Sequence, residues 1–212
     1  MKYLNRLKKA KLWNIIGVTL IAIGLLVLAP ILYFHYTNTG TANANSADQL
    51  RILEQAQTAK PTIAQNVVTG FPTAISIPGP RSVLDMNVPV IPGYYNKSNN
   101  SWTLTESSAQ FAVMSAQPNN ITGNTYIYGH YRPEVFAYLH WITPGTIATV
   151  TTNNGYQFQY KYVGTYAVQP NDTGVLNPSK SPILTVQTCS GAFFQNRQMY
   201  IFSYQNYKKV NA

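Results

Sequence analysis

Cysteine and acidic residues are both scarce in this sequence. Its 212 residues contain one cysteine, Cys189, and six aspartates and glutamates. One cysteine excludes an internal disulfide, so the thiol is either free or joined to another chain. The six acids are scattered along the chain, whereas Ca²⁺ is bound by clustered oxygen ligands, so we expect neither a metal ion nor another cofactor.

A basic stripe with interleaved aromatic side chains, typical of nucleic-acid binding, is also missing. The formal charge is +9, but it is spread unevenly. Five of the cations lie in the first eleven residues, namely Lys2, Arg6, Lys8, Lys9 and Lys11. The other ten Lys and Arg, set against six acids, leave about +4 for the rest of the chain. The positive charge therefore indicates a membrane partner and no nucleic acid.

One long run, residues 12–34, contains no charged residue and can cross a bilayer, which needs roughly 20 apolar residues. The cations precede it directly, so the positive-inside rule places the N-terminus in the cytoplasm and the rest of the chain outside. We therefore predict a basic tail and a single transmembrane helix over residues 1–36. A cleaved signal peptide is the alternative, because Ala42-Asn43-Ala44 looks like a cleavage site, but its apolar region is usually shorter.

The rest of the chain changes character at Phe71. Residues 37–70 are polar, and we interpret them as an extracytoplasmic stalk with a short helix from Ser46 to about Ala59. Beyond Phe71, β-like runs alternate with Gly, Pro and Asn, and one helical segment is expected at Pro133–Trp141. The predicted strands are Thr73–Ile77, Val88–Ile91, Thr125–Tyr128, Thr146–Thr151, Tyr156–Val163, Thr165–Val168, Ile183–Gln187 and Met199–Tyr204. Residues 71–212 are thus predicted to be an all-β sandwich or closed barrel.

The candidate chemistry lies where predicted strands end. The strand at Ile183–Cys189 is followed by a loop and by Arg197 at the start of the next strand, so an antiparallel hairpin would place Cys189 and Arg197 at the same end of the sheet. His130 leaves an earlier strand in the same way, after Gly129. A nearby cation favours the nucleophilic thiolate form of cysteine. Histidine can protonate a leaving amine, and arginine can stabilise an oxyanion.

These residues match a known pattern. The strand Thr185-Val186-Gln187-Thr188-Cys189, with Arg197 opening the next strand and Gly129-His130 ending an earlier one, resembles the sortases, whose signature is T-L-x-T-C with a downstream Arg and an upstream Gly-His. Val186 stands where Leu is usual. The resemblance runs over most of residues 71–206.

The resemblance implies an eight-stranded β-barrel with short helical connections and a cysteine transpeptidase in a bacterial cell membrane. Its substrates would be secreted proteins with an LPxTG-like C-terminal sorting signal, and its acceptor an amine of a cell-wall precursor or a pilin subunit. Carried over, Cys189 is the nucleophile, His130 the general acid and base, and Arg197 the oxyanion or positioning residue. Thr188 and Arg132 are candidate substrate-binding residues, although Arg132 also suits a solvated loop cation.

Other interpretations stay open. A lone cysteine is often a small buried hydrophobe, and His140 fits a packing role on its helical segment. No Asp is followed by Pro, so the lid motif of pilin-polymerising sortases is missing and a housekeeping protein-anchoring enzyme is favoured. Papain-like peptidases place Cys before His, the reverse of the order here. The alternative outside enzymes is a non-catalytic, membrane-anchored β-domain that binds an envelope partner.

Overall fold

The structure is a computed structural model that describes residues 16–29, 46–58, 66–79, 85–96, 98, 101–191 and 194–210. The chain divides into two compact units, Met1–Gly40 and Thr41–Ala212. In the first unit, residues 16–29 are helical, and their apolar side chains are mostly exposed.

Much of the predicted membrane segment falls outside the described residues. That holds for the basic tail, for both ends of the run at 12–34, and for Ala42-Asn43-Ala44. Among the residues that are described, no helix has the length and apolarity that crossing a membrane requires. The boundaries predicted for tail, stalk and catalytic domain stay a prediction.

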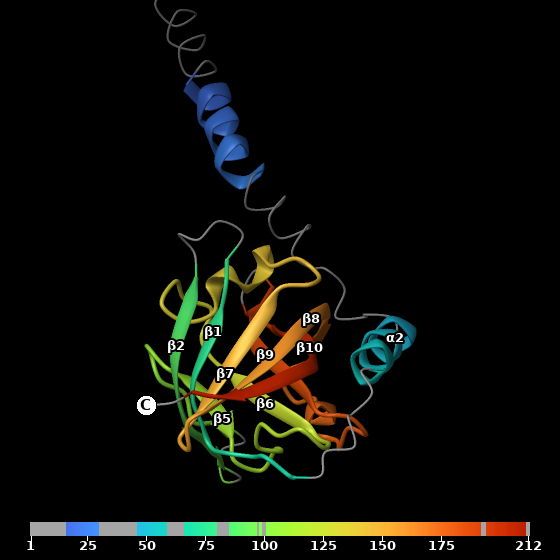
Figure 1. The fold of residues 1–212 in the computed structure, drawn as a ribbon. Helices are drawn as coiled ribbons and strands as arrows, with labels where there is room; N and C mark the ends of the chain where they lie inside the picture. Colours follow the sequence, from blue (N-terminus) through green and yellow to red (C-terminus); the bar gives the residue numbers. More distant parts are fainter. Residues whose placement is uncertain are drawn as a thin grey trace, which may run out of the picture. The chain divides into compact units, whose positions relative to one another are not determined.

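Eight strands close into a barrel in the second unit, in the order β1-β2-β5-β6-β9-β10-β8-β7 (Figure 1). Their bounds are β1 Pro72–Ile77, β2 Met86–Gly93, β5 Ala109–Ala112, β6 Asn124–Tyr128, β7 Ile147–Thr152, β8 Tyr156–Val168, β9 Ile183–Ser190 and β10 Asn196–Lys209. A separate two-stranded sheet is formed by β3 (Tyr95–Asn96) and β4 (Ser101–Trp102). The predicted all-β, eight-stranded barrel is confirmed.

Three neighbouring strands determine where the candidate chemistry lies. β6 runs parallel to β9, and β9 runs antiparallel to β10. Consequently the carboxyl ends of β6 and β9 and the amino end of β10 meet at one edge of the barrel. The chain leaves or enters the sheet at this edge with Gly129, Cys189 and Arg197.

The barrel interior is filled by alternate side chains of the strands. On β9, Leu184 and Val186 belong to the interior core, which includes Phe111, Ile127 and Phe158 and excludes water from the centre. Because successive side chains of a strand point to opposite faces, Thr185, Gln187 and Cys189 face outward. Strand alternation alone therefore puts the thiol on the outside of the barrel.

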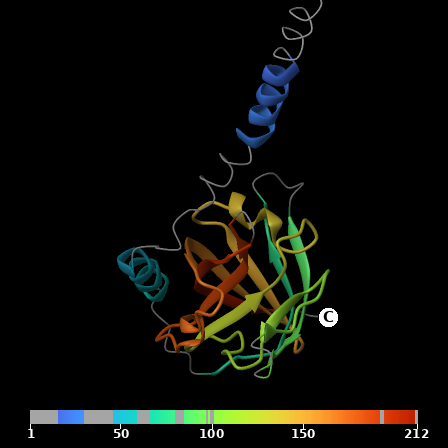
Figure 2. The same cartoon turned by 180° about the vertical axis from the view of Figure 1, so that it is seen from behind.

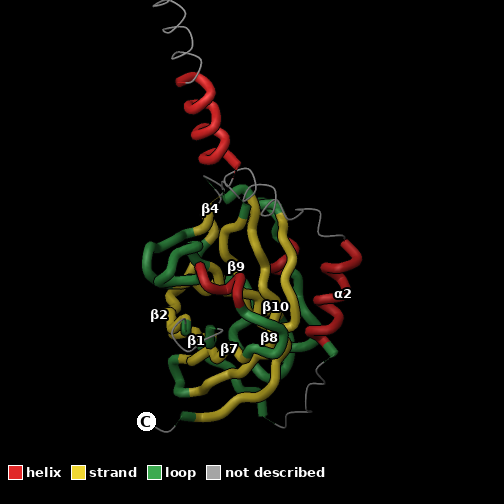
Figure 3. Tube along the Cα trace, turned by 90° about the horizontal axis from the view of Figure 1, so that it is seen from above, coloured by secondary structure: helices red, strands yellow, loops and turns green. Residues whose placement is uncertain are grey.

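A second apolar cluster covers the outer face of β8 and β10. Helix α2 (Ser46–Gln57) places Ile52 and Ala56 against barrel residues such as Tyr166, Met199 and Ile201. Figures 2 and 3 show α2 at the side of the barrel, beside β8 and β10. Part of the predicted stalk is thus packed against the barrel.

The strand predictions need correcting at β8, at β5 and at the two short strands β3 and β4, which the sequence pattern did not predict. Tyr156–Val163 and Thr165–Val168 are one strand, β8, because the register shifts opposite Ile201 and Phe202 and the pairing continues through Gly164. The sequence pattern also missed β5, whose four residues are all buried and show no alternation. The predicted helical segment is confirmed in its second half, where η2 (Ala137–Trp141) is a 3-10 helix. The short helix η3 (Gly174–Leu176) lies in the loop before β9.

Candidate active site

Cys189 and Arg197 are direct partners across the β9–β10 hairpin. This confirms that the two residues lie at the same end of the sheet. β6 ends beside them, because Tyr128 is paired with Gln187 and the backbone N–H of Gly129 donates to the Gln187 carbonyl over 3.1 Å. His130 therefore leaves β6 next to the strand end that carries Cys189.

The backbone around His130 is held from several directions. The Thr188 hydroxyl donates to the Gly129 carbonyl over 3.1 Å, and the Phe136 N–H donates to the His130 carbonyl over 3.3 Å. Gly129 also has no room for a side chain, because an added Cβ would lie 2.7 Å from Cγ1 of Val135. The glycine before His130 thus lets the 133–136 turn close over the end of β6.

Thr188 faces the barrel interior and not the groove beside Cys189. Its side chain is fully buried and bonded to Gly129. This placement suits holding the His130 segment in register with β9. The predicted contact between Thr188 and substrate stays a prediction.

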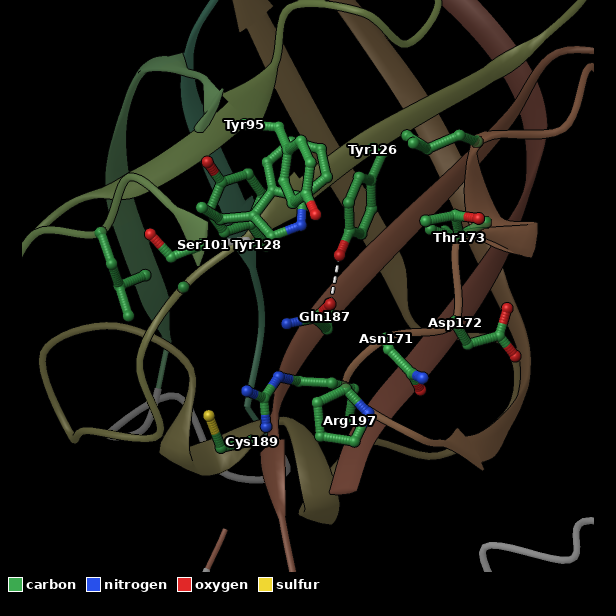
Figure 4. A pocket seen from close by; sticks show the side chains of 16 residues that line it. Tyr95, Ser101, Tyr126, Tyr128, Asn171, Asp172, Thr173, Gln187, Cys189 and Arg197 are labelled. Carbon is green, nitrogen blue, oxygen red and sulfur yellow. Dashed lines mark hydrogen bonds between the residues drawn. The ribbon is translucent and has the colours of Figure 1, made fainter. Parts of the chain in front are cut away.

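A groove of about 530 Å³ runs from Cys189 along the outer faces of β9 and β6. One wall carries the rings of Tyr95, Trp102, Tyr126 and Tyr128. The centroid of the Trp102 ring lies 5.1 Å from that of Tyr128 and 5.9 Å from that of Tyr126. The opposite wall is the loop of Pro170–Thr173, and Cys189 and Arg197 lie together at one end (Figure 4). An extended peptide can lie in such a groove beside the thiol.

The Arg197 guanidinium is oriented by the hairpin loop. Its Nη1 donates to the carbonyl oxygens of Phe194, over 3.0 Å, and of Asn196, over 3.1 Å. In Figure 4 the guanidinium points toward the Cys189 sulfur. Its charge acts within the groove: burial, the largest effect, raises the pKa of Tyr126, and the positive charge of Arg197 partly opposes that rise. Arg197 thus places a fixed positive charge beside the thiol.

A carboxylate that the sequence pattern did not indicate lies beside His130. Oε1 of Glu106 is 4.0 Å from Nε2 of His130, and its other oxygen pairs with Arg132. Glu106 is 68% exposed and His130 28%. At this distance a carboxylate attracts a protonated imidazole. Glu106 comes from the loop before β5, and its place in the sequence carries no signal for this contact.

Arg132 lies outside the groove lining, on the exposed loop after His130. Its ion pair with Glu106 fits the interpretation of a solvated loop cation. His140 lies on η2, where its ring packs edge-on against Trp141 with centroids 4.7 Å apart. His140 itself is exposed, and its packing role stays a prediction. In the described part of the chain, no three His, Cys, Asp or Glu side chains gather as metal ligands.

Comparisons with known proteins agree with this architecture. The model of the Sortase domain matches residues 75–205. Sortase C of Streptococcus pneumoniae superposes with a TM-score of 0.53 at 15% identity, over 87% of this chain and 100% of that one. The SrtA sortase of Actinomyces oris gives 0.52 at 19% identity, over 72% and 90%. A lid mutant of sortase A from Corynebacterium diphtheriae gives 0.51 at 20% identity, over 87% and 95%. No curated protein matches the chain.

At these identities the solved structures show a shared fold, whereas the domain match spans more than half of the chain. The chain therefore belongs to the sortase family. Sortases are cysteine transpeptidases that attach proteins to the cell wall, and this chain carries the single cysteine that such chemistry needs.

Proposed function

We propose that this sortase is a membrane-tethered extracytoplasmic transpeptidase whose nucleophile is Cys189. The observation that carries the proposal is the pairing of Cys189 with Arg197 at the end of a peptide-sized groove, where the His130 segment also leaves the sheet. The cysteine is partly exposed and can meet a substrate. A structural cysteine would fit the interior face of β9 better than this rim.

The first half of the reaction forms a thioester. The Cys189 thiolate attacks the carbonyl carbon of the signal's Thr, and the new C–S bond gives a tetrahedral oxyanion that Arg197 stabilises. The C–N bond to the following residue then breaks, and His130 gives its proton to the departing amine. The acyl group stays on the sulfur.

The second half of the reaction transfers the acyl group. An acceptor amine attacks the thioester carbonyl, a new amide forms and the C–S bond breaks. His130 takes a proton from the incoming amine, and the thiolate is regenerated. We propose LPxTG-like signals of secreted proteins as donors and a cell-wall precursor or a pilin subunit as the acceptor, with the housekeeping anchoring role favoured. Thr188 and Arg132 remain proposed contacts to the substrate.

We propose a bacterial cell-membrane location with the N-terminus in the cytoplasm. The uncharged run at 12–34 and the cations before it support a single span. The exposed apolar side chains of the helix at 16–29 suit a lipid environment.

The test is cleavage of a fluorescent LPxTG-type peptide by purified protein. Cys189→Ala, His130→Ala and Arg197→Ala should each lower the rate at least a hundredfold, in keeping with the usual contribution of such groups. His140→Ala serves as the matched histidine control and should keep most of the activity. Equal losses at His140 in a folded protein would reject His130 as the acid, and unaltered cleavage by Cys189→Ala would reject Cys189 as the nucleophile. A folded wild-type protein that cleaves no such peptide and whose Cys189 is not labelled by a small thiol reagent would indicate the binding module.

A further inference from the structure

Gln187 is the residue of the groove floor that the proposed mechanism leaves unused. It lies two residues before Cys189 on β9, so both side chains point to the same outer face. It lines the groove and is partly exposed. In Figure 4 it lies between Tyr126 and Arg197, on the path from the aromatic wall to the thiol.

The orientation of the Gln187 amide is set by Tyr126. The Tyr126 hydroxyl donates to Oε1 of Gln187, and the ring is buried beside Trp102 and Tyr128. Because the acceptor oxygen of the amide is occupied, the NH2 group with its two donors is directed elsewhere. Figure 4 shows this nitrogen turned away from Tyr126 and toward the open groove.

Tyr126 is itself fixed and remains a donor. Its strand, β6, is paired in parallel with β9, so both partners are held by the same sheet. Burial raises the pKa of its phenol, which keeps the hydroxyl protonated under physiological conditions. The pair is therefore a preorganised donor on the groove floor, with little side-chain freedom to lose on binding.

We propose that Gln187 is a substrate-positioning residue whose amide NH2 donates a hydrogen bond to a main-chain carbonyl of the bound sorting signal. The inference rests on the proposed function, which puts the residues before the scissile bond in the groove. Two residues of strand cover about 7 Å, and an extended peptide advances at nearly the same rate. The contacted carbonyl is therefore one or two residues before the Thr that acylates Cys189. Contact with a main-chain oxygen makes this interaction independent of the side chain at that position.

The experiment compares Gln187→Leu with the wild-type enzyme in steady-state cleavage of the signal peptide. Leucine keeps the approximate volume and removes both donors. KM should rise about three- to tenfold with kcat nearly unchanged, as expected for one neutral hydrogen bond formed in ground and transition states alike. Tyr126→Phe frees the amide and should raise KM in the same direction by a smaller factor. Gln157→Leu is the matched control on β8, at the end of that strand remote from Arg197, and should change nothing.

Two further peptides identify the acceptor atom, each with an alkene isostere in place of one of the two candidate amides. The peptide that lacks the contacted carbonyl should bind the wild-type enzyme more weakly and gain no further penalty with Gln187→Leu. Additive penalties, or an unchanged KM for Gln187→Leu, would overturn the inference while leaving the transpeptidase intact. A wild-type enzyme that fails to cleave any signal peptide would instead reject the proposed function.

Discussion

At the scale of single residues, a hydrogen bond on the inner face of β9 supports the site on the outer face of the same strand. Thr188 points into the barrel and ties β9 to the Gly129 carbonyl, one residue before His130. Its neighbour Cys189 points outward to the groove. Because adjacent side chains of a strand point to opposite faces, Thr188 supports the His130 segment from inside the barrel, whereas Cys189 faces the groove.

Replacing Thr188 by Val keeps its shape but leaves the buried Gly129 carbonyl without this donor. We expect the free energy of unfolding to fall by about 1–2 kcal/mol, since an unmade buried hydrogen bond costs this much. We also expect kcat to fall, because the His130 segment loses its tie to β9. Urea unfolding and peptide cleavage measure the two effects.

Thr149→Val is the matched control, because Thr149 on β7 does not line the groove and makes no side-chain hydrogen bond within the described residues. It should leave both quantities unchanged. If Thr188→Val proved as stable and active as wild type, the tie to Gly129 would not position His130.

The contacts of Glu106 and Gln187 show the limit of prediction from single residues. The hairpin rule placed Cys189 opposite Arg197, because that pairing is local in the chain. Glu106 meets His130 from the loop before β5, and Tyr126 meets Gln187 from a strand 61 residues away. Nothing local marks such contacts, because only the strand order of the barrel brings them together.

At the scale of elements, helix α2 is an integral part of the barrel's outer layer. Ile52 fills the space above Gly164, where an added Cβ would lie 3.1 Å from its side chain. The Ser181 hydroxyl donates to the Gln57 carbonyl over 2.9 Å, which ties the end of α2 to the segment before β9. The polar composition of residues 37–70 predicted a stalk and its helix, but not this docking, because among the helix side chains that the structure describes only Ile52 and Ala56 are buried.

Truncating Ile52 to Ala should therefore destabilise the catalytic unit. We expect a loss of about 2–3 kcal/mol in the free energy of unfolding, as for other buried isoleucines. Amide hydrogen exchange in α2 should also become faster in this variant. Leu50→Ala is the control on the exposed face of the helix, with a 59% exposed side chain. Identical behaviour of the two variants would show that α2 does not rest on the barrel in solution.

The glycine inside the long strand β8 is also explained at the scale of elements. Gly164 looks like a break in the sequence, since glycine weakens strands. In the structure it admits Ile52, and the register shift beside it lets the strand bend along the barrel. From the sequence pattern alone, a glycine that makes room for a neighbouring helix cannot be distinguished from a glycine that ends a strand.

At the scale of the whole molecule, the many tyrosines of the barrel predict its response to alkali. Burial raises the pKa of both Tyr162 and Tyr166 to about 12, from an ordinary value of 10. Between these values the unfolded chain loses phenolic protons that the folded chain keeps, so the free energy of unfolding falls as pH rises. The loss should reach up to about 2 kcal/mol for each buried tyrosine.

Chemical unfolding between about pH 8 and 12, a range that begins below the unfolded-state titration near pH 10, measures this effect, with tyrosinate absorbance recorded in parallel. Stability should be flat below about pH 10 and then decline, and a large part of the absorbance should rise only with unfolding. Full phenolate absorbance from a still-folded protein near pH 10 would contradict the burial of these rings.

Transpeptidation by this protein depends on an acyl group that resides on one sulfur. The most direct measurement is mass spectrometry of the intact protein, trapped by acid after brief mixing with LPxTG-type peptides and without an amine acceptor. We predict a mass increase equal to the peptide fragment up to Thr, located at Cys189 after digestion and removed by hydroxylamine. The adduct should be missing in Cys189→Ala and greatly reduced in Arg197→Ala. Peptide cleavage without any adduct at Cys189, or an adduct elsewhere in the chain, would contradict the account.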